Sequence, residues 1–174
     1  VASLVGSEMC IRDSNKPFKK KEYYHFLKTS DLSLVVAEIK KNVFVLVSQK
    51  RIPVNKINYE FPSGMIDKGE NSISAACREF YEETGYKILG RPKKLFTINC
   101  EPGRLTTKIY CYYSNKIIKK KGPEKGIKIH LLSKEKINKL ILNEKFSNAS
   151  HIASFFKVVK AVSYTHLTLP TNGT

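Results

Sequence analysis

Residues 64–86 read GMIDKGENSISAACREFYEETGY, and this stretch carries most of the information about the fold. It fits the spacing G-x5-E-x7-R-E-U-x-E-E-x-G-U, in which U is a bulky aliphatic residue. The residues in register are Gly64, Glu70, Arg78, Glu79, Glu82, Glu83 and Gly85. The two U positions hold Phe80 and Tyr86, which keep bulk and apolar character, so we interpret them as variants. Seven matches at fixed spacing make a far more specific signal than a short glycine motif.

The same stretch predicts a helix over residues 72–84. Residues at helical spacing form a stripe that is expected to be buried: Ile73, Ala76, Cys77, Phe80 and Thr84. Asn71 or Ser72 can cap the start of the helix, and Gly85 suits a left-handed exit from it. At the helical angle per residue, the three box glutamates that follow Arg78 fall together beside the stripe.

These three carboxylates, of Glu79, Glu82 and Glu83, predict a metal site. Like charges one turn apart repel by about 0.2–0.5 kcal/mol per pair even on an exposed helix, and a divalent cation removes that repulsion. Mg²⁺ takes oxygen ligands and bridges to substrate phosphates, and Mn²⁺ suits the same ligands. The alternative is a solvated Glu-rich helix. It is disfavoured because six of the 15 acidic residues lie between Glu60 and Glu83. Arg78 and Glu70 are expected to pair and to hold the preceding loop against the helix.

A length of 174 residues indicates one domain with a sizeable core. Residues 1–15 and 162–174 resemble translated adaptor sequence, so we expect the native domain to span 16–161; genuine divergent termini are the alternative. No apolar run is long enough to span a bilayer, and we expect no membrane association. Within 16–161 the cysteines are Cys77, Cys100 and Cys111, an odd set that is typical of reduced thiols in a cytoplasmic protein.

The formal net charge is +16, which is compatible with a nucleic-acid partner. The positive charge is mostly lysine scattered through expected loops, with its densest clusters at residues 19–21 and 119–121. We favour solvated surfaces for both clusters over phosphate-attracting patches.

An α/β fold follows from the order of the expected elements. Strands are expected at residues 23–27, 32–39, 43–48, 57–61, 94–99, 106–113 and 127–132, and further helices at 134–142 and 147–162. Ser133 and Ser147 are candidate helix caps. A mixed sheet with the helix at 72–84 on one face and the later helices on the other makes a three-layer α/β/α sandwich.

Residues 64–86 match the Nudix box, and the chain resembles the Nudix hydrolases, whose fold is such a sandwich. Outside the box it is similar to the ADP-ribose pyrophosphatase branch at four places: residues 49–51 (QKR), 60–64 (EFPSG), 101–103 (EPG) and 146–156 (FSNASHIASFF). Pro102 lies sixteen residues beyond Tyr86, a spacing that is associated with ADP-ribose hydrolases. The resemblance covers most of residues 23–160, but only the box is highly specific.

The resemblance implies roles for individual residues. Glu79, Glu82 and Glu83 would ligate Mg²⁺ with the backbone carbonyl of Ser63. Gly64, Glu70, Arg78 and Gly85 would be structural. Among the substrate-binding residues, Arg51 would contact the diphosphate, Glu60 would hold the nucleoside or ribose, and Pro102 and Arg104 would belong to the substrate-binding turn. For Arg51 an ordinary exposed cation is an equal alternative.

Two departures from the branch concern the general base. Relatives place an acid shortly after the turn at 101–103, where this chain has Thr106 and Thr107. They also place a Glu in the loop before the last strand, where the best alignment has Lys125 with Glu124 beside it. The base is therefore Glu124, Glu79 or a hydroxide on the metal.

The resulting hypothesis is Mg²⁺-dependent hydrolysis of a nucleoside diphosphate linked to a second group, with ADP-ribose giving AMP and ribose 5-phosphate. The alternatives are another substrate (a sugar nucleotide, a dinucleoside polyphosphate or capped RNA) or a non-catalytic RNA-binding module. The module is disfavoured because all four box glutamates are retained. The resemblance also implies a homodimer, with N-terminal strands exchanged in many relatives.

Overall fold

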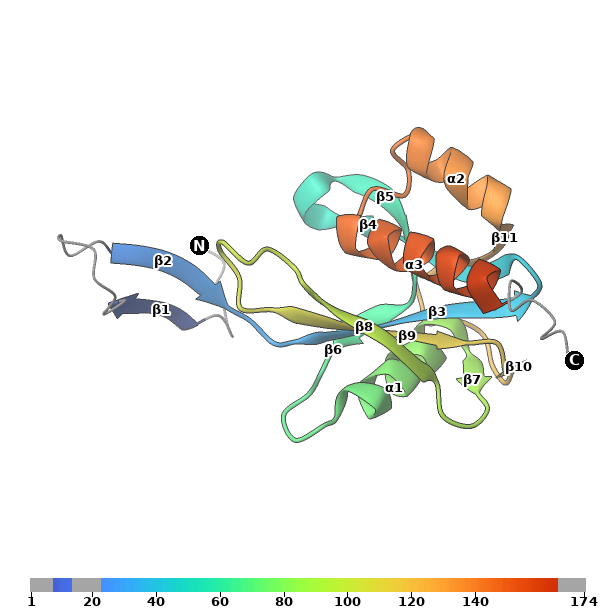
Figure 1. Ribbon diagram of the computed structural model, residues 1–174, viewed down its shortest axis with the longest axis horizontal. Coiled ribbons are helices and arrows are strands. Elements are labelled where there is room, and N and C mark those ends of the chain that lie inside the picture. The colour runs from blue at the N-terminus through green and yellow to red at the C-terminus, as the bar shows by residue number, and fades with distance from the viewer. Residues whose placement is uncertain (1–7, 14–22, 166–174) are drawn as a thin grey trace, which may run out of the picture.

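A mixed sheet forms the centre of the molecule. The computed structural model describes residues 8–13 and 23–165 (Figure 1). The seven strands of this sheet are β3 (Leu32–Lys40), β4 (Val43–Arg51), β5 (Lys56–Glu60), β6 (Ser63–Met65), β8 (Lys93–Asn99), β9 (Lys108–Ser114) and β11 (Lys128–Ser133). Their order is β11-β4-β3-β9-β8, with β5 also paired to β4 and β6 to β3. β3 and β9 run parallel and the other pairs antiparallel, so the predicted mixed sheet is confirmed.

Helices cover both faces of the sheet, as the sequence predicts. Helix α1 (Ser72–Thr84) lies on one face, and α2 (Lys134–Leu142) and α3 (Ala149–Thr165) lie on the other (Figure 1). The layers are therefore α/β/α. Among the described residues, no helix combines the length and the apolar character that crossing a membrane requires.

Strand β3 explains why the core has two halves. Its side chains alternate between the faces, so Leu34 and Val36 join the cluster under α3, whereas Val35 and Ala37 join the cluster under α1. Burial on both faces accounts for the nearly continuous apolar sequence of this strand. The centre of the sheet thus holds α1 and α3 at fixed positions relative to each other.

Two small antiparallel pairs accompany the main sheet. β1 (Glu8–Asp13) pairs with β2 (Tyr23–Lys28) in a ribbon that projects from the body (Figure 1). β7 (Tyr86–Ile88) pairs with β10 (Ile117–Lys119) beside the end of α1. The expected strand at 23–27 is therefore present, but it pairs with β1 and not with the central sheet. Assignment of residues 1–15 and 162–174 to added sequence stays a prediction.

Three short strands were not expected from the sequence, and the start of the last helix was placed wrongly. Strands β6, β7 and β10 have three residues each, which is too short to show a period of two. The last helix begins at Ala149, and Ser147 does not cap it because its hydroxyl and amide donate to Asn58 of β5. Asn148 accepts the amide of Ser150 at 3.1 Å and takes the capping position. Ser133 caps α2, as predicted.

The ends of α1 follow the chemistry of their residues. Of the two candidate caps, Asn71 is the one used, because its side chain accepts the amides of Ile73 and Ser74 at 3.1 and 2.9 Å. At the other end, Gly85 has φ +68° and accepts two backbone amides of the loop that follows β10. A Cβ on Gly85 would lie 2.2 Å from the carbonyl oxygen of Lys121. Gly85 is therefore required both by its conformation and by this close approach.

We predict that Gly85→Ala lowers the free energy of unfolding by about 1–3 kcal/mol, because the left-handed conformation and the collision with Lys121 both penalise a side chain. Gly90→Ala is the matched control, since φ there is +77° but no atom lies within 4 Å of the added carbon. Chemical denaturation measures both losses. Equal losses in the two variants would show that the contact with Lys121 contributes nothing.

Candidate active site

The turn from β5 into β6, at residues 60–64, and the second half of α1 form the centre of the site. Glu83 points from α1 toward this turn, and its Oε2 accepts the backbone amide of Ser63 at 3.1 Å. Glu79 lies one turn earlier, directly against Gly64, where an added Cβ would be 2.0 Å from the Glu79 carboxyl carbon. Glycine at position 64 thus lets the backbone approach the helix closely enough for both contacts.

Arg78 joins the box loop to the box glutamates. Its Nε and Nη2 donate to the two carboxylate oxygens of Glu70 at 3.1 and 2.9 Å, and Nη2 also donates to the carbonyl of Met65 at 3.0 Å. Nη1 donates to Glu79 at 2.7 Å and to Glu82 at 3.3 Å. The predicted pairing of Arg78 with Glu70 is confirmed, and the same guanidinium also orients two of the three glutamates.

Burial makes ionisation costly at two of these carboxylates. Glu83 is only 7% exposed, and burial raises its pKa to about 8, helped by the negative charges of Glu79 and Glu60 and opposed by the Ser63 amide and by Arg51. Burial also raises the pKa of Glu79, although its hydrogen bond with Arg78 opposes the change. The fixed positive charge nearby is therefore too small to compensate both carboxylates.

The carboxylates of Glu79, Glu82 and Glu83 are chemically suitable ligands for a divalent cation, but they do not surround a common point. Carboxylate oxygens are the ligands that hard cations prefer, and a cation would offset the burial of Glu83. In the part of the chain that is described, no three acidic, histidine or cysteine side chains converge closely enough to hold an ion. Glu79 and Glu82 face Arg78 instead. To hold a cation, Glu79 and Glu82 would therefore have to release the guanidinium of Arg78 and bind the metal instead.

Arg51 and Glu60 form a second charged group close to the first. The Nε of Arg51 donates to both oxygens of Glu60 at 3.0 and 3.2 Å, Nη2 also donates to Glu60, and Asn58 donates at 3.0 Å. Burial alone would raise the pKa of Glu60, but the hydrogen bonds from Arg51 and Asn58 and the positive charge of Arg51 hold it below its ordinary value. Because both Arg51 and Glu60 act on the ionisation of Glu83, the two groups belong to one site.

The exposures of this pair differ. Glu60 is 3% exposed, whereas the side chain of Arg51 is 41% exposed. Arg51 can therefore reach a ligand in solvent, while Glu60 acts mainly on Arg51. The separate substrate roles of both residues stay predictions.

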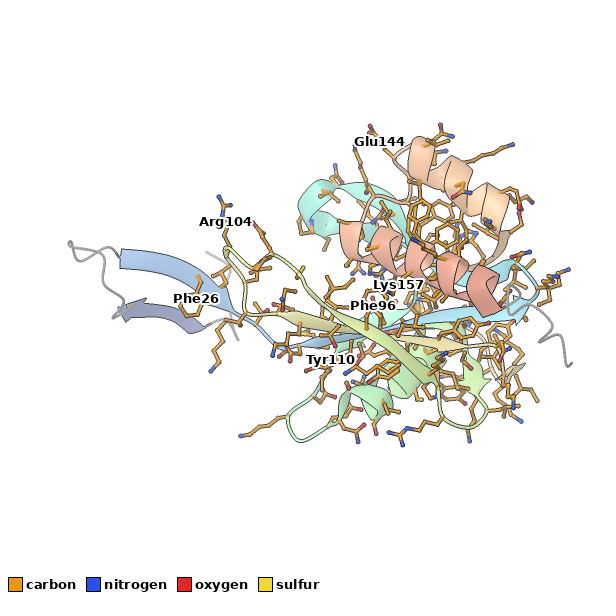
Figure 2. All side chains as sticks on the ribbon, in the orientation of Figure 1. Phe26, Phe96, Arg104, Tyr110, Glu144 and Lys157 are labelled. Carbon is orange, nitrogen blue, oxygen red and sulfur yellow. The ribbon has the colours of Figure 1, made fainter. Side chains whose placement is uncertain are left out.

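Three predicted residues lie apart from these groups. Glu124 is exposed in the loop before β11, where its carbonyl accepts the amide of Ile127. Pro102 and Arg104 are exposed in the loop between β8 and β9, and the carbonyl of Arg104 accepts the amide of Leu27. Figure 2 shows Arg104 beside β2 and away from α1. Among the described contacts, none connects these three residues to the box glutamates.

Two residues at the site escaped the sequence-based prediction. His151 of α3 accepts the backbone amide of Phe61 at 3.0 Å, and Lys119 of β10 donates to the carbonyl of Thr84 at 2.7 Å. Both contacts are to backbone atoms far away in sequence. A histidine on the apolar side of an expected helix was the only available signal, and by itself it indicates an ordinary core residue.

Comparisons with known proteins bear on the family and the fold of this chain. The family model described as NUDIX domain matches residues 28–144. The chain is 39% identical over 72 residues to ADP-ribose pyrophosphatase of Saccharomyces cerevisiae, which is 40% of this chain and 30% of that protein. It is 51% identical over 43 residues to ADP-sugar pyrophosphatase of Mus musculus, which is 25% of this chain and 20% of that protein.

A solved structure, described as the crystal structure of ADP compounds hydrolase, matches the fold with a TM-score of 0.73 and 16% identity. The match covers 92% of this chain and 94% of that one. In contrast, the chain spans less than half the length of the curated relatives that it matches.

We predict that Glu83 makes the stability of the metal-free protein fall as pH rises. Its pKa is about 8 in the folded state and near the ordinary carboxylate value in the unfolded chain, so between these values the folded state binds the extra proton. Glu83→Gln should remove this decline, and its stability relative to wild type should increase between pH 5 and pH 8.5. Urea denaturation in the presence of a chelator at several pH values measures the effect. Glu144→Gln, in the exposed loop after α2, is the control; a Glu83→Gln slope equal to wild type would refute the assignment.

Proposed function

The chain belongs to the NUDIX domain family, and on this premise we propose that it hydrolyses the pyrophosphate bond of a nucleoside diphosphate linked to a second group. One observation supports this reaction best. The carboxylates of Glu79 and Glu83 have too little positive charge around them to offset their burial, and they lie beside the exposed guanidinium of Arg51. We propose ADP-ribose as the substrate, with AMP and ribose 5-phosphate as products. The names of the matched relatives, which refer to ADP-ribose, ADP-sugars and ADP compounds, favour this class.

The proposed cofactor is Mg²⁺, for which Mn²⁺ can substitute. Glu79, Glu82 and Glu83 would hold it together with the backbone carbonyl of Ser63. When bound, the cation supplies positive charge for the oxygens of the pyrophosphate group. Arg78 would keep its contacts with Glu70 and the carbonyl of Met65, so the box loop would stay attached to α1 while Glu79 and Glu82 held the cation.

The protein residues position the substrate and move one proton. A water oxygen bonds to one phosphorus, its proton passes to a carboxylate, and the bond from that phosphorus to the bridging oxygen breaks, which leaves the second phosphate as the leaving group. Glu79 is the proposed base, and such assistance typically contributes about 10²–10⁴-fold. Arg51 would bind the diphosphate, and Glu60 would orient Arg51 and the nucleoside or ribose. Glu124 would act only if the loop that carries it moves toward the substrate.

Two other functions remain as outcomes of the test. One is hydrolysis of a sugar nucleotide, a dinucleoside polyphosphate or capped RNA at the same site. The other is a non-catalytic module that binds RNA, to which the net charge of +16 would be suited. A homodimer is compatible both with hydrolysis of these substrates and with RNA binding.

We predict that purified protein with MgCl₂ releases AMP and ribose 5-phosphate from ADP-ribose, and that Glu82→Gln lowers kcat by about 100-fold or more because it removes a charge from the cation site. Chromatography of the products from ADP-ribose, ADP-glucose, diadenosine polyphosphates and capped RNA identifies the preferred substrate. Glu135→Gln, an exposed acid on α2, is the matched control and should keep wild-type turnover.

The results can contradict the proposal in two ways. Wild-type turnover in Glu82→Gln would refute the role of the glutamates. If none of the substrates is hydrolysed while RNA binds tightly, the non-catalytic alternative is correct.

We also predict that Mg²⁺ raises the Tm of wild type at pH 7.5 and raises that of Glu83→Gln much less. A ligand at about 100 times its Kd stabilises a folded protein by about 2.7 kcal/mol, which is a readily measured shift. Differential scanning calorimetry at matched ionic strength, with NaCl in place of MgCl₂, separates binding from screening. Equal stabilisation of the two proteins would show that Glu83 does not hold the ion.

A further inference from the structure

We propose that His151 of α3 is a positioning residue for the hydrolytic site, because it binds the backbone amide of Phe61 and thereby helps to fix the nearby Ser63 amide that Glu83 binds. The inference rests on the proposed function for its kinetic part only. His151 belongs to the helix on the opposite face of the sheet from α1 (Figure 1). It is not a catalytic residue, since its contact is with the backbone.

Each of the four residues 60–63 is held by a different element. The carboxylate of Glu60 binds Arg51 at the end of β4. The amide of Phe61 donates to Nδ1 of His151 at 3.0 Å, and the carbonyl of Pro62 accepts the amide of Val35 in β3 at 3.0 Å. The amide of Ser63 donates to Glu83 of α1 at 3.1 Å. Contacts from both helical layers therefore meet within one short turn.

Residues 61–63 are stiff enough to transmit a displacement. Pro62 has its φ restricted by its ring, which limits how far Phe61 can move independently of residue 63. The Pro62 carbonyl and the Ser63 amide belong to one planar peptide group, which Val35 of β3 holds on one side and Phe61 supports on the other. Loss of the acceptor for the Phe61 amide would therefore remove the second support and loosen the Ser63 amide. A displacement of about 1 Å at a reacting group can cost about 100-fold in rate.

The surroundings of His151 keep its imidazole neutral, and Nδ1 can accept the hydrogen bond from Phe61 only in that state. It is 4% exposed and lies parallel to the Phe61 ring, at 14° between planes, with Phe146 at a steep angle on another side. Since Nδ1 accepts a hydrogen bond, the neutral ring carries its proton on Nε2. Burial lowers the pKa of His151 to about 4, with Glu60 raising it and Arg51 lowering it, so the acceptor persists at neutral pH.

The turn before α3 holds the same region independently. Ser147 donates to Oδ1 of Asn58, and Nδ2 of Asn58 donates to Glu60 at 3.0 Å. Residues at the beginning of α3 thus contact Glu60 through Asn58, and they also hold the Phe61 amide close to the Ser63 amide that binds Glu83. An ordinary core histidine would support the stability of the fold without this connection to the site.

The test compares two substitutions of His151 with one control. His151→Leu keeps an apolar side chain but removes the acceptor, whereas His151→Asn can place an oxygen where Nδ1 lies. Ser154→Ala is the control, because Ser154 is buried on the same helix and binds Cys111 and Ser150 away from residues 60–63. Each protein is assayed for kcat and KM on the substrate that wild type prefers, normalised to the folded fraction. Hydrogen exchange of the Phe61 and Ser63 amides is followed by NMR.

We expect His151→Leu to lower kcat by about tenfold or more with KM within about twofold of wild type, and to accelerate exchange at both amides. His151→Asn should restore most of kcat and the slow exchange. Ser154→Ala should lower Tm but keep wild-type kcat and wild-type exchange at residues 61 and 63.

Three results would overturn the inference. They are wild-type kcat in His151→Leu, an unchanged exchange rate at Ser63 in that variant, and equal impairment of His151→Asn and His151→Leu. If wild type hydrolyses no substrate, the proposed function fails, and the exchange of the Ser63 amide decides the positioning role separately.

Discussion

The hydrogen bond from the Ser63 amide to the buried carboxylate of Glu83 is the contact on which the rest of the site depends. It holds the carboxyl group of Glu83 beneath the turn at residues 60–63, where solvent contributes little to stabilising a negative charge. The approach of the turn to α1 requires Gly64, and the box loop is held to the same helix by Arg78. The chemistry of the site follows from keeping this carboxylate where its charge has too few partners.

Positive charge is distributed unevenly around the two carboxylate groups. Arg78 is engaged by Glu70, Glu79 and Glu82, whereas Arg51 is engaged by Glu60 and keeps a large exposed surface. One guanidinium therefore maintains the box, and the other is available to an anionic ligand. This division explains why two arginines in one small region are not interchangeable.

The sequence predicted most of the fold and one ion pair of the candidate site. Strand β3 and the box helix were predictable because an apolar run and fixed polar spacing are local properties. The pairing of Arg78 with Glu70 followed from positions on one helix and its preceding loop. The contact of His151 with Phe61 was not predictable, because it joins residues 90 positions apart through a backbone atom. The positions of the loops that carry Arg104 and Glu124 were not predictable for a related reason, since each position depends on the surface against which the loop packs.

The attachment of the lysine-rich loop to the end of α1 has a consequence for how such a protein can diversify. Residues 119–121 are anchored there: Lys119 donates to Thr84, the amides of Lys120 and Lys121 donate to Gly85, and the Lys121 ammonium lies over the ring of Tyr81 at 4.6 Å. Residues 122–126 are exposed. The loop is thus divided into an anchored half and an open half. Changes of length or charge can accumulate in the open half without loosening the helix that carries the glutamates.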